Sequence, residues 1–449
     1  MSIVETKFNE DERNSRTLQY TERVLDTSIC VAISGDPDFL ESLPGQQALI
    51  TAVNLIARMT SSMSVNIPTI TNRLPQIAPG DTIDKAMADF ARAVNPAIRL
   101  DRNGQHQTYR FHLGRSVEGM NVIGGQWTGA FGSVLPSVES VDSAVGFGAC
   151  AAVCGAVAHM FRTDFGPPST STSIDLFRRQ IMTSGDPMDS CGVEPLKLGN
   201  LWLVGCGSIG SSALFFLGMN PAEADVRLID GDIVKNHNLD RAACFLAQDL
   251  GKNKVDACER FIRTCPNITT AKDPTYLHKS TLWANRAPQD VDLIIAAANE
   301  YGVRTRIESS FPPIQIYATT GSYWQASVWC HIPNKTGCSC CAFPPSATRS
   351  NMQCAIGNPD LVQDRRPDAP QNDASLPFLS FFGGLLVAAE IYRLAIGDIP
   401  PPRYDLWTAN GLEIFALDAP EDATCICQRR SIRTQEMVVR DTRYGHLIL

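Results

Sequence analysis

The chain has 449 residues, 44% of them hydrophobic, which suits two to three domains with sizeable cores. Its formal net charge is −8, and no stripe of Lys and Arg with interleaved aromatic residues occurs, which argues against a nucleic-acid groove and favours a protein partner. Residues 1–16 are polar and charged without an apolar signal segment, so we expect a cytoplasmic protein with reduced thiols.

The first predicted elements are a short strand at 28–33 and an apolar helix at 48–59. An internal repeat follows, because residues 155–168 resemble residues 386–402, and each is an apolar helix that ends at a Gly and Pro boundary. The helix at 386–402 continues an apolar run from 378 that charged residues interrupt before it is long enough to span a bilayer, so we expect it to be buried and expect no membrane association.

The repeat predicts two α/β units, at residues 1–170 and 171–449, joined by a Ser-, Thr- and Pro-rich linker at 166–173. Such a pair forms tandem Rossmann-like domains, packed as an intramolecular pseudo-dimer.

The second unit contains the most informative stretch of the chain. An apolar run at 201–204 predicts a strand that leads into a Gly-x-Gly-x-x-Gly pattern, formed by Gly205, Gly207 and Gly210. Glycines at a turn before a helix let backbone N–H groups approach a phosphate closely, at the positive end of the helix dipole. A second strand at 226–229 ends in Asp230, where a carboxylate can bind ribose hydroxyls. The first unit lacks these features, so we predict that it is a degenerate copy.

Several charged and polar residues follow the second strand: Asp232, Asn238, Arg241, Lys252 and Lys254. Two or three cations beside a phosphate cradle suit a triphosphate better than a dinucleotide. With its Asn238-Leu239-Asp240-Arg241 run and Lys254, the stretch resembles the E1-like (ThiF/MoeB) adenylating superfamily, which includes ubiquitin-activating enzymes and bacterial activators of sulfur-carrier proteins. The resemblance implies that ATP binds here, with its ribose at Asp230 and its phosphates at Asn238, Arg241 and Lys254.

The resemblance also implies a Mg²⁺ ion beside the ATP phosphates. This chain departs from the family at one residue of the expected magnesium site. A strand at 291–295 is usually followed by a Cys-Thr-Asp-Asn turn whose Asp helps place magnesium, but here Asn299 stands at the Asp position. An amide oxygen coordinates magnesium more weakly than a carboxylate. We expect Glu300 or Asp232 to carry the metal, and the alternative is reduced activity.

The fifteen cysteines fall into different groups. Six lie in apolar or helical patterns and are predicted core residues: Cys30, Cys150, Cys154, Cys206, Cys244 and Cys258. Two tight clusters, Cys338-Ser-Cys340-Cys341 and Cys425-Ile-Cys427, could close a tetrahedral thiolate site. The family commonly holds a structural zinc at such places, which implies Zn²⁺ on Cys338, Cys341, Cys425 and Cys427, although the C-x-C spacing leaves the fourth ligand open.

Cys354 lies in a polar segment with Arg349 nearby, and a thiol beside a positive charge suits a nucleophile. In ubiquitin-activating relatives the crossover loop at this place bears the cysteine that accepts the modifier, so we predict that role for Cys354. An incidental loop cysteine and an alternate zinc ligand are the competing interpretations. The resemblance also implies that Arg16 reaches across the pseudo-dimer to the ATP phosphates, with a solvated helix charge as the alternative.

The resulting prediction is an enzyme similar to the E1 components of bacterial ubiquitin-like conjugation (Bil-type, antiphage) operons. It would adenylate the C-terminal carboxylate of a ubiquitin-like protein, form a thioester on Cys354 and pass the modifier to an E2-like partner; a homo-oligomer is compatible with the sequence. One alternative is a sulfur-carrier or peptide adenylyltransferase without thioester transfer. Another is a nucleotide-binding pseudoenzyme scaffold, which Asn299 supports. Arg241 and Lys254 disfavour an NAD-linked oxidoreductase.

Overall fold

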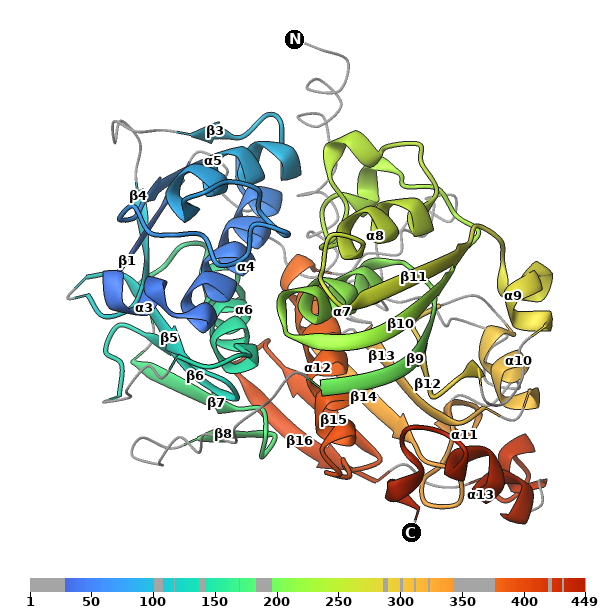
Figure 1. The fold of residues 1–449 in the computed structure, drawn as a ribbon. Helices are drawn as coiled ribbons and strands as arrows, with labels where there is room; N and C mark the ends of the chain where they lie inside the picture. The colour runs from blue at the N-terminus through green and yellow to red at the C-terminus, as the bar shows by residue number, and fades with distance from the viewer. Residues whose placement is uncertain are drawn as a thin grey trace, which may run out of the picture.

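The computed structural model describes residues 29–448, except for 101–107, 117, 137–141, 169, 183–195, 286–289, 299–301, 311, 322–323, 343–375, 419–421 and 430–431. The described chain forms two mixed sheets of eight strands each, with helices packed on them (Figure 1). In each sheet five neighbouring strands run parallel and the last three continue antiparallel. This shared topology confirms the predicted fold of tandem Rossmann-like units.

The first sheet has the strand order β3-β2-β1-β4-β5-β6-β7-β8. Its strands are β1 (Cys30–Gly35), β2 (Ser62–Asn66), β3 (Arg99–Leu100), β4 (Thr108–Leu113), β5 (Met120–Gly124), β6 (Thr128–Gly132), β7 (Ser171–Asp175) and β8 (Gln180–Met182). Its helices are α3 (Pro37–Glu41), α4 (Leu43–Met59), α5 (Ile83–Val94) and α6 (Phe147–Arg162).

The second sheet repeats this pattern in the order β11-β10-β9-β12-β13-β14-β15-β16. Its strands are β9 (Leu196–Val204), β10 (Ala222–Ile229), β11 (Ile268–Asp273), β12 (Leu293–Ala296), β13 (Ile314–Gly321), β14 (Gln325–His331), β15 (Arg403–Trp407) and β16 (Glu413–Leu417). Its helices are α7 (Ser208–Met219), α8 (Lys254–Ile262), α9 (Thr281–Ala284), α10 (Val303–Ser309), α11 (Ser339–Ala342), α12 (Pro377–Ala395) and α13 (Ile432–Arg440).

The sheets divide the chain later than residue 170. Strands β7 and β8 follow that residue and yet extend the first sheet, with β7 pairing antiparallel to β6. The predicted linker at 166–173 therefore includes the start of a strand, because Thr172 and Ile174 are β-branched and Ile174 is buried in the core. We name residues 29–182 the first unit and residues 196–448 the second unit. That each unit is a separate domain stays a prediction.

The repeated helices α6 and α12 occupy equivalent places, each before the last two strands of its sheet, and face each other between the units (Figure 1). The ring of Phe147 on α6 packs edge-on against Tyr392 on α12, with ring centroids 5.0 Å apart. Both helices contribute to one continuous apolar core that extends through the two units. Among the described helices, α12 alone is long and apolar enough to cross a bilayer, but it is entirely buried in the protein, as predicted for an internal helix.

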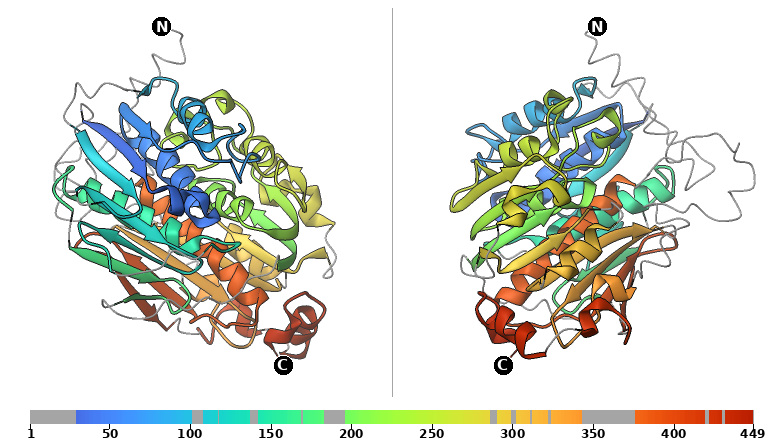
Figure 2. Two further views of the ribbon diagram at one scale, coloured as in Figure 1. Left: turned by 60° about the vertical axis from the view of Figure 1, so that its left-hand side comes forward. Right: turned by 90° about the vertical axis from the view of Figure 1, so that its right-hand side faces the viewer.

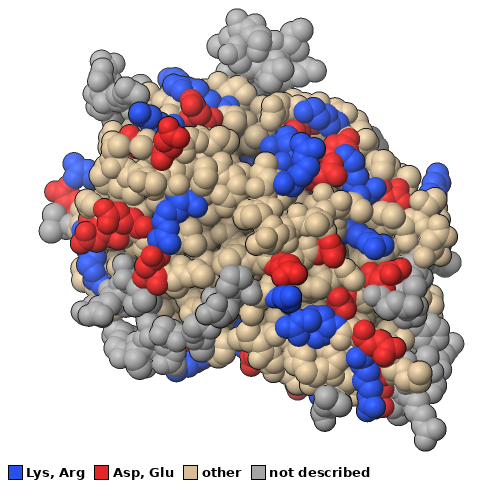
Figure 3. All heavy atoms as spheres, in the orientation of Figure 1, with Lys and Arg blue, Asp and Glu red and all other residues tan. Residues whose placement is uncertain are grey.

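The six cysteines predicted to lie in the core are all buried, which confirms that prediction. On the face shown in Figure 3 the blue Lys and Arg side chains are interspersed with red Asp and Glu side chains. Figure 2 shows the C-terminal helices, in dark red, gathered at one end of the molecule below the second sheet.

Candidate functional site

The glycine loop connects β9 to α7 at the point where the strand order of the second sheet reverses. Strand β10 lies on one side of β9 and β12 on the other, and ligands of such sheets bind outside the strand ends at this switch point. Gly205 has a φ of +96°, which side chains rarely adopt. A Cβ on Gly210 would overlap the carbonyl oxygen of Gly205, whereas one on Gly207 would meet no atom within 4 Å. The loop therefore packs tightly against α7 at Gly210, whereas Gly207 has free space beside its Cα.

Asp230 at the end of β10 fixes the shape of this loop. One carboxylate oxygen accepts a hydrogen bond from the Cys206 N–H at 2.7 Å, and the other accepts one from the Asp232 N–H at 2.8 Å. The side chain is 7% exposed, and this burial raises its pKa, while Lys254 acts in the opposite direction. Each carboxylate oxygen keeps a further lone pair for a ligand hydroxyl.

Lys254, the first residue of α8, lies beside two carboxylates. Its Nζ donates to Asp232 Oδ2 at 2.8 Å, and the Tyr276 hydroxyl donates to Asp232 Oδ1 at 2.9 Å. Burial alone would lower the pKa of Lys254, but Asp230 and Asp232 raise it overall, so the lysine stays cationic. Burial would likewise raise the pKa of Asp232, but its bonds to Lys254 outweigh that effect and lower it.

Arg241 is the most unusual charge in the site. Its side chain is 7% exposed, and its Nη1 has no hydrogen-bond partner among the residues that the structure describes. The Nε atom lies 4.0 Å from Asp240 Oδ1. Asn238, three residues earlier, accepts the Lys235 N–H at 2.9 Å with its side-chain oxygen and so closes the turn before Arg241. A buried guanidinium with an unused N–H is a ready donor for an anion.

These groups meet at one cavity of about 420 Å³, a size that suits a nucleotide. Its lining consists of Gly205, Gly207, Ser208, Ile209, Asp230, Asp232, Lys235, His237, Asn238, Arg241, Lys254, Ala297, Ala298, Arg304, Ala318, Thr319 and Thr320. The structure thus brings together seven of the sequence-predicted residues: Gly205, Gly207, Asp230, Asp232, Asn238, Arg241 and Lys254. Gly210 supports the loop from beneath rather than lining the cavity, and Lys252 pairs with Asp249 instead.

The sequence interpretation overlooked several lining residues. Arg304 comes from α10, just after the turn at the end of β12, and Thr319 and Thr320 come from the carboxyl end of β13. A cation shortly after a predicted strand end was the available signal for Arg304. Three predicted residues, Arg16, Asn299 and Cys354, lie outside the described residues, as does Glu300, so their roles stay predictions.

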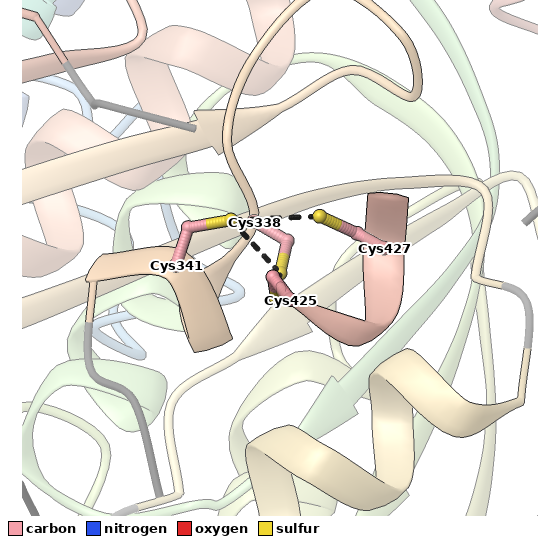
Figure 4. A group of neighbouring side chains, drawn as sticks. All are labelled: Cys338, Cys341, Cys425 and Cys427. Carbon is pink, nitrogen blue, oxygen red and sulfur yellow. Dashed lines mark hydrogen bonds between the residues drawn. The ribbon is translucent and has the colours of Figure 1, made fainter. Parts of the chain in front are cut away.

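A second group of side chains lies beside α10, the helix that contributes Arg304 to the cavity. Cys338 directly precedes α11 and Cys341 lies within it, whereas Cys425 and Cys427 come from the segment before α13 (Figure 4). All four Sγ atoms lie within 4.8 Å of one another, with Cys338 to Cys425 and Cys341 to Cys427 both at 3.5 Å. Four thiolates bound tetrahedrally to zinc at about 2.3 Å would lie about 3.8 Å apart.

The cluster thus fits a structural zinc ion, and both cysteines of the C-x-C pair belong to it. Hydrogen bonds from Cys338 and then Cys341 lower the pKa of Cys427 to about 5, so this one cysteine favours the thiolate, the form that binds metal. The fifth nearby cysteine, Cys340, directs its Sγ to the Thr305 hydroxyl at 3.8 Å. When bound, zinc would join the end of β14 to the C-terminal segment.

The fold and the first cavity define a Rossmann-like α/β protein with a nucleotide-sized cavity that four cationic side chains and two carboxylates line. Comparison with protein families places it further: the model of the ThiF family matches residues 177–427, and the chain belongs to this family of E1-like adenylating proteins.

Two relatives illustrate the range of similarity. The uncharacterized protein y4jF of Sinorhizobium fredii is 23% identical over 339 residues, which cover 70% of this chain and 60% of that protein. The adenylyltransferase and sulfurtransferase uba4 of Emericella nidulans is 28% identical over 181 residues, 37% of this chain and 36% of that protein. This chain therefore matches less than two thirds of the length of either relative. Among solved structures, E. coli MccB is similar at a TM-score of 0.39 and 20% identity, over 51% of this chain and 65% of that chain.

Proposed function

We propose that the protein binds ATP in the cavity at the glycine loop and transfers the adenylyl group to the C-terminal carboxylate of a protein or peptide. The observation that carries this proposal is the buried guanidinium of Arg241 at the wall of the cavity, because its Nη1 has no hydrogen-bond partner within the described part of the chain. Burying such a donor costs free energy unless a ligand accepts its hydrogen bond. The planar guanidinium matches a phosphate group, and Lys235, Lys254 and Arg304 add positive charge around the same space.

The reaction would start when a carboxylate oxygen of the substrate attacks the α-phosphorus of ATP. The bond from that phosphorus to the β-phosphate oxygen breaks, which releases pyrophosphate and leaves an acyl-adenylate. Arg241 and Lys254 would balance the charge that develops on the phosphates, while the N–H groups of the glycine loop hold them in place. Mg²⁺, when bound, would neutralise phosphate charge, and Asp232 is the carboxylate in the cavity lining that remains for it when Asp230 binds the ribose.

Binding of ATP is the first test. We would titrate the full chain with Mg-ATP by isothermal titration calorimetry and compare Arg241→Ala with Arg92→Ala, an exposed arginine on α5 paired with Asp89. A hydrogen bond to a charged group contributes about 1.5–3 kcal/mol, so Arg241→Ala should raise the dissociation constant for ATP by about 10- to 100-fold. The Arg92 variant should bind as the wild type does. Equal binding by all three proteins would contradict the proposed role of Arg241.

We further propose that the substrate is a ubiquitin-like protein and that Cys354 takes the acyl group from its adenylate as a thioester, for transfer to an E2-like partner. The thiolate sulfur would attack the carbonyl carbon of the mixed anhydride, and AMP would leave. The support is the resemblance of the Gly205-to-Lys254 motifs to those of the E1-like superfamily and the placement of Cys354 between the cysteine pair and α12 in the sequence.

A second candidate is adenylyl transfer without a thioester, which the similarity to uba4, an adenylyltransferase and sulfurtransferase, favours. Intact mass under non-reducing conditions separates the two. Wild type and Cys354→Ala would be incubated with Mg-ATP and a ubiquitin-like protein encoded beside this gene. A thiol-sensitive adduct on the wild type alone supports the thioester. Pyrophosphate exchange by both proteins without an adduct supports the second candidate, and no exchange favours a pseudoenzyme.

A further inference from the structure

The loop that carries Arg241 is anchored by a residue of the other unit. Arg58, near the end of α4 in the first unit, is 1% exposed and donates hydrogen bonds to three backbone carbonyls of the second unit. It contacts the Leu239 oxygen, the Ala243 oxygen at 3.2 Å and the Phe245 oxygen at 2.8 Å. Its Nε also donates to Asn54 on the same helix at 2.9 Å.

These contacts enclose Arg241 from both sides along the chain. Leu239 lies two residues before it, Ala243 two residues after it and Phe245 four residues after it. Asn54 adds a fourth contact, since its side-chain N–H donates to the Ala243 oxygen at 3.1 Å. The N–H groups of this segment make short turn bonds, such as Ala242 N–H to the Asn238 oxygen and Phe245 N–H to the Ala242 oxygen. The long-range restraints come from side chains: Arg260 of α8 donates to the Cys244 oxygen at 2.9 Å within the second unit, and the fork of Arg58 adds the restraint from the first unit.

We propose that Arg58 is a positioning residue for Arg241 and that the first unit, although it lacks the glycine loop, completes the nucleotide site of the second. This inference rests on the proposed ATP binding. Arg58 fixes the backbone on both sides of Arg241. The Arg241 guanidinium therefore needs less reordering when a phosphate binds, and this preorganisation is what the bonds of Arg58 provide. Helix α4 lies on the side of the first unit that faces the second (Figure 1).

The same helix offers a matched control. Gln47 is buried, and its side-chain N–H donates across the same boundary to the Met219 oxygen at 2.6 Å, at the far end of α7 from the glycine loop. Gln47→Met therefore removes a buried contact between the units without touching residues 238–245. Arg58→Lys keeps the charge and part of the bonding, so it serves where Arg58→Met fails to fold.

The test measures Mg-ATP binding to the full chain by calorimetry in a double-mutant cycle. We expect Arg58→Lys to weaken ATP binding by about tenfold, because small misplacements of a binding group carry large costs. In an Arg241→Ala background the same substitution should change binding by less than about twofold, since the group it positions is gone. Gln47→Met should lower the melting temperature and leave the dissociation constant within about twofold.

Hydrogen exchange of residues 238–245 gives an independent readout, and we expect faster exchange in Arg58→Lys and no change in Gln47→Met. Equal losses from Arg58→Lys with and without Arg241 would overturn the inference and leave ATP binding in place. An equal loss in Gln47→Met would show a merely structural role. A wild-type chain that binds no ATP would overturn both this inference and the proposed function.

Discussion

Substitution by alanine should affect stability at Gly210 and ATP binding at Gly207, although both glycines belong to the same loop. A Cβ on Gly210 would overlap the Gly205 carbonyl, so Gly210→Ala should lower the free energy of unfolding by about 1–3 kcal/mol through strain. Gly207 has a φ of −75° and open space around its Cα, so Gly207→Ala should unfold as the wild type does but bind ATP more weakly. Urea denaturation and calorimetry on both variants check this. A lower free energy of unfolding in Gly207→Ala would contradict the free space that the structure shows beside Gly207.

The pair formed by Lys254 and Asp232 predicts a pH-dependent contribution to stability. Because Lys254 lowers the pKa of Asp232, the stabilisation is present above the unfolded Asp pKa of about 3.9 and is lost as the pH falls through the lower folded value. The pKa of Lys254 is raised, so its contribution persists up to its unfolded pKa of about 10.4 and is lost above it.

Lys254→Met should therefore lower the urea midpoint at pH 7, where two carboxylates lose their cation. The difference from the wild type should shrink as the pH falls below about 4, because both carboxylates then become neutral. Lys197→Met, which removes an exposed lysine paired with Glu223, controls for net charge. A difference that stays constant down to pH 2.5–3, by the same denaturation curves, would argue against the ion pair.

Residues of the site were predictable where the chemistry is local in sequence. The glycine loop and Asp230 follow strand ends, and Asn238 and Arg241 belong to one short run, so spacing alone places them at one sheet edge. Arg304 and Thr320 reach the cavity from later strands and helices, and only the folding of the sheet brings them there. The pairing of Lys254 with Asp232 could not be read from the sequence either, because it depends on side-chain geometry.

At the scale of elements, periodicity located the strands and helices but misjudged some ends. Helix α4 begins at Leu43 rather than near 48, since Pro44 and Gly45 normally signal a break. Here Pro44 lies in the first turn, where its missing N–H is harmless, and the Ser42 hydroxyl accepts the Gly45 N–H at 3.1 Å as an N-cap. The same Ser- and Thr-rich composition that suggested a linker forms the start of β7, because an antiparallel partner was available in β6.

The cysteine cluster predicts one zinc ion per chain, measurable by elemental mass spectrometry. Cys427→Ser should abolish the bound metal and lower the melting temperature, because the C-terminal segment loses its link to α11. Cys340→Ser is the matched control, since Cys340 lies beside the cluster but outside its four thiols. Zinc retained in Cys427→Ser, or lost in Cys340→Ser, would mean that the ligand set is different.

At the scale of the whole molecule, two units of one topology have diverged at the same loop. After β9 the loop is open and lined by N–H groups, whereas after β1 the chain turns at Asp36. The Asp36 carboxylate accepts the Arg115 N–H at 2.7 Å and lies 2.9 Å from the His112 ring. An anion already occupies this strand end, so a phosphate would be repelled. The first unit therefore contributes to the site from its helix face, through Arg58, rather than through a second cavity.

The boundary between the units also contains a buried ion pair. Arg179, in the turn between β7 and β8, donates two hydrogen bonds to Glu390 on α12, at 2.8 and 2.5 Å. Glu390 is 1% exposed, and Arg393, its other cation, lies farther away at 3.5 Å. Removing Arg179 leaves a buried carboxylate with weaker compensation, which costs free energy, whereas replacing both partners with apolar side chains avoids that cost.

We therefore expect Arg179→Met to lower the free energy of unfolding by about 3 kcal/mol and Arg179→Met/Glu390→Met to recover most of that loss. Arg92→Met, at an exposed pair, should cost less than about 0.5 kcal/mol.

Because one apolar core extends through both units, urea unfolding followed by circular dichroism and by tryptophan fluorescence should give coincident single transitions for the wild type. Separate transitions, or additive losses in the double variant, would mean that the units fold independently and that the ion pair does not couple them.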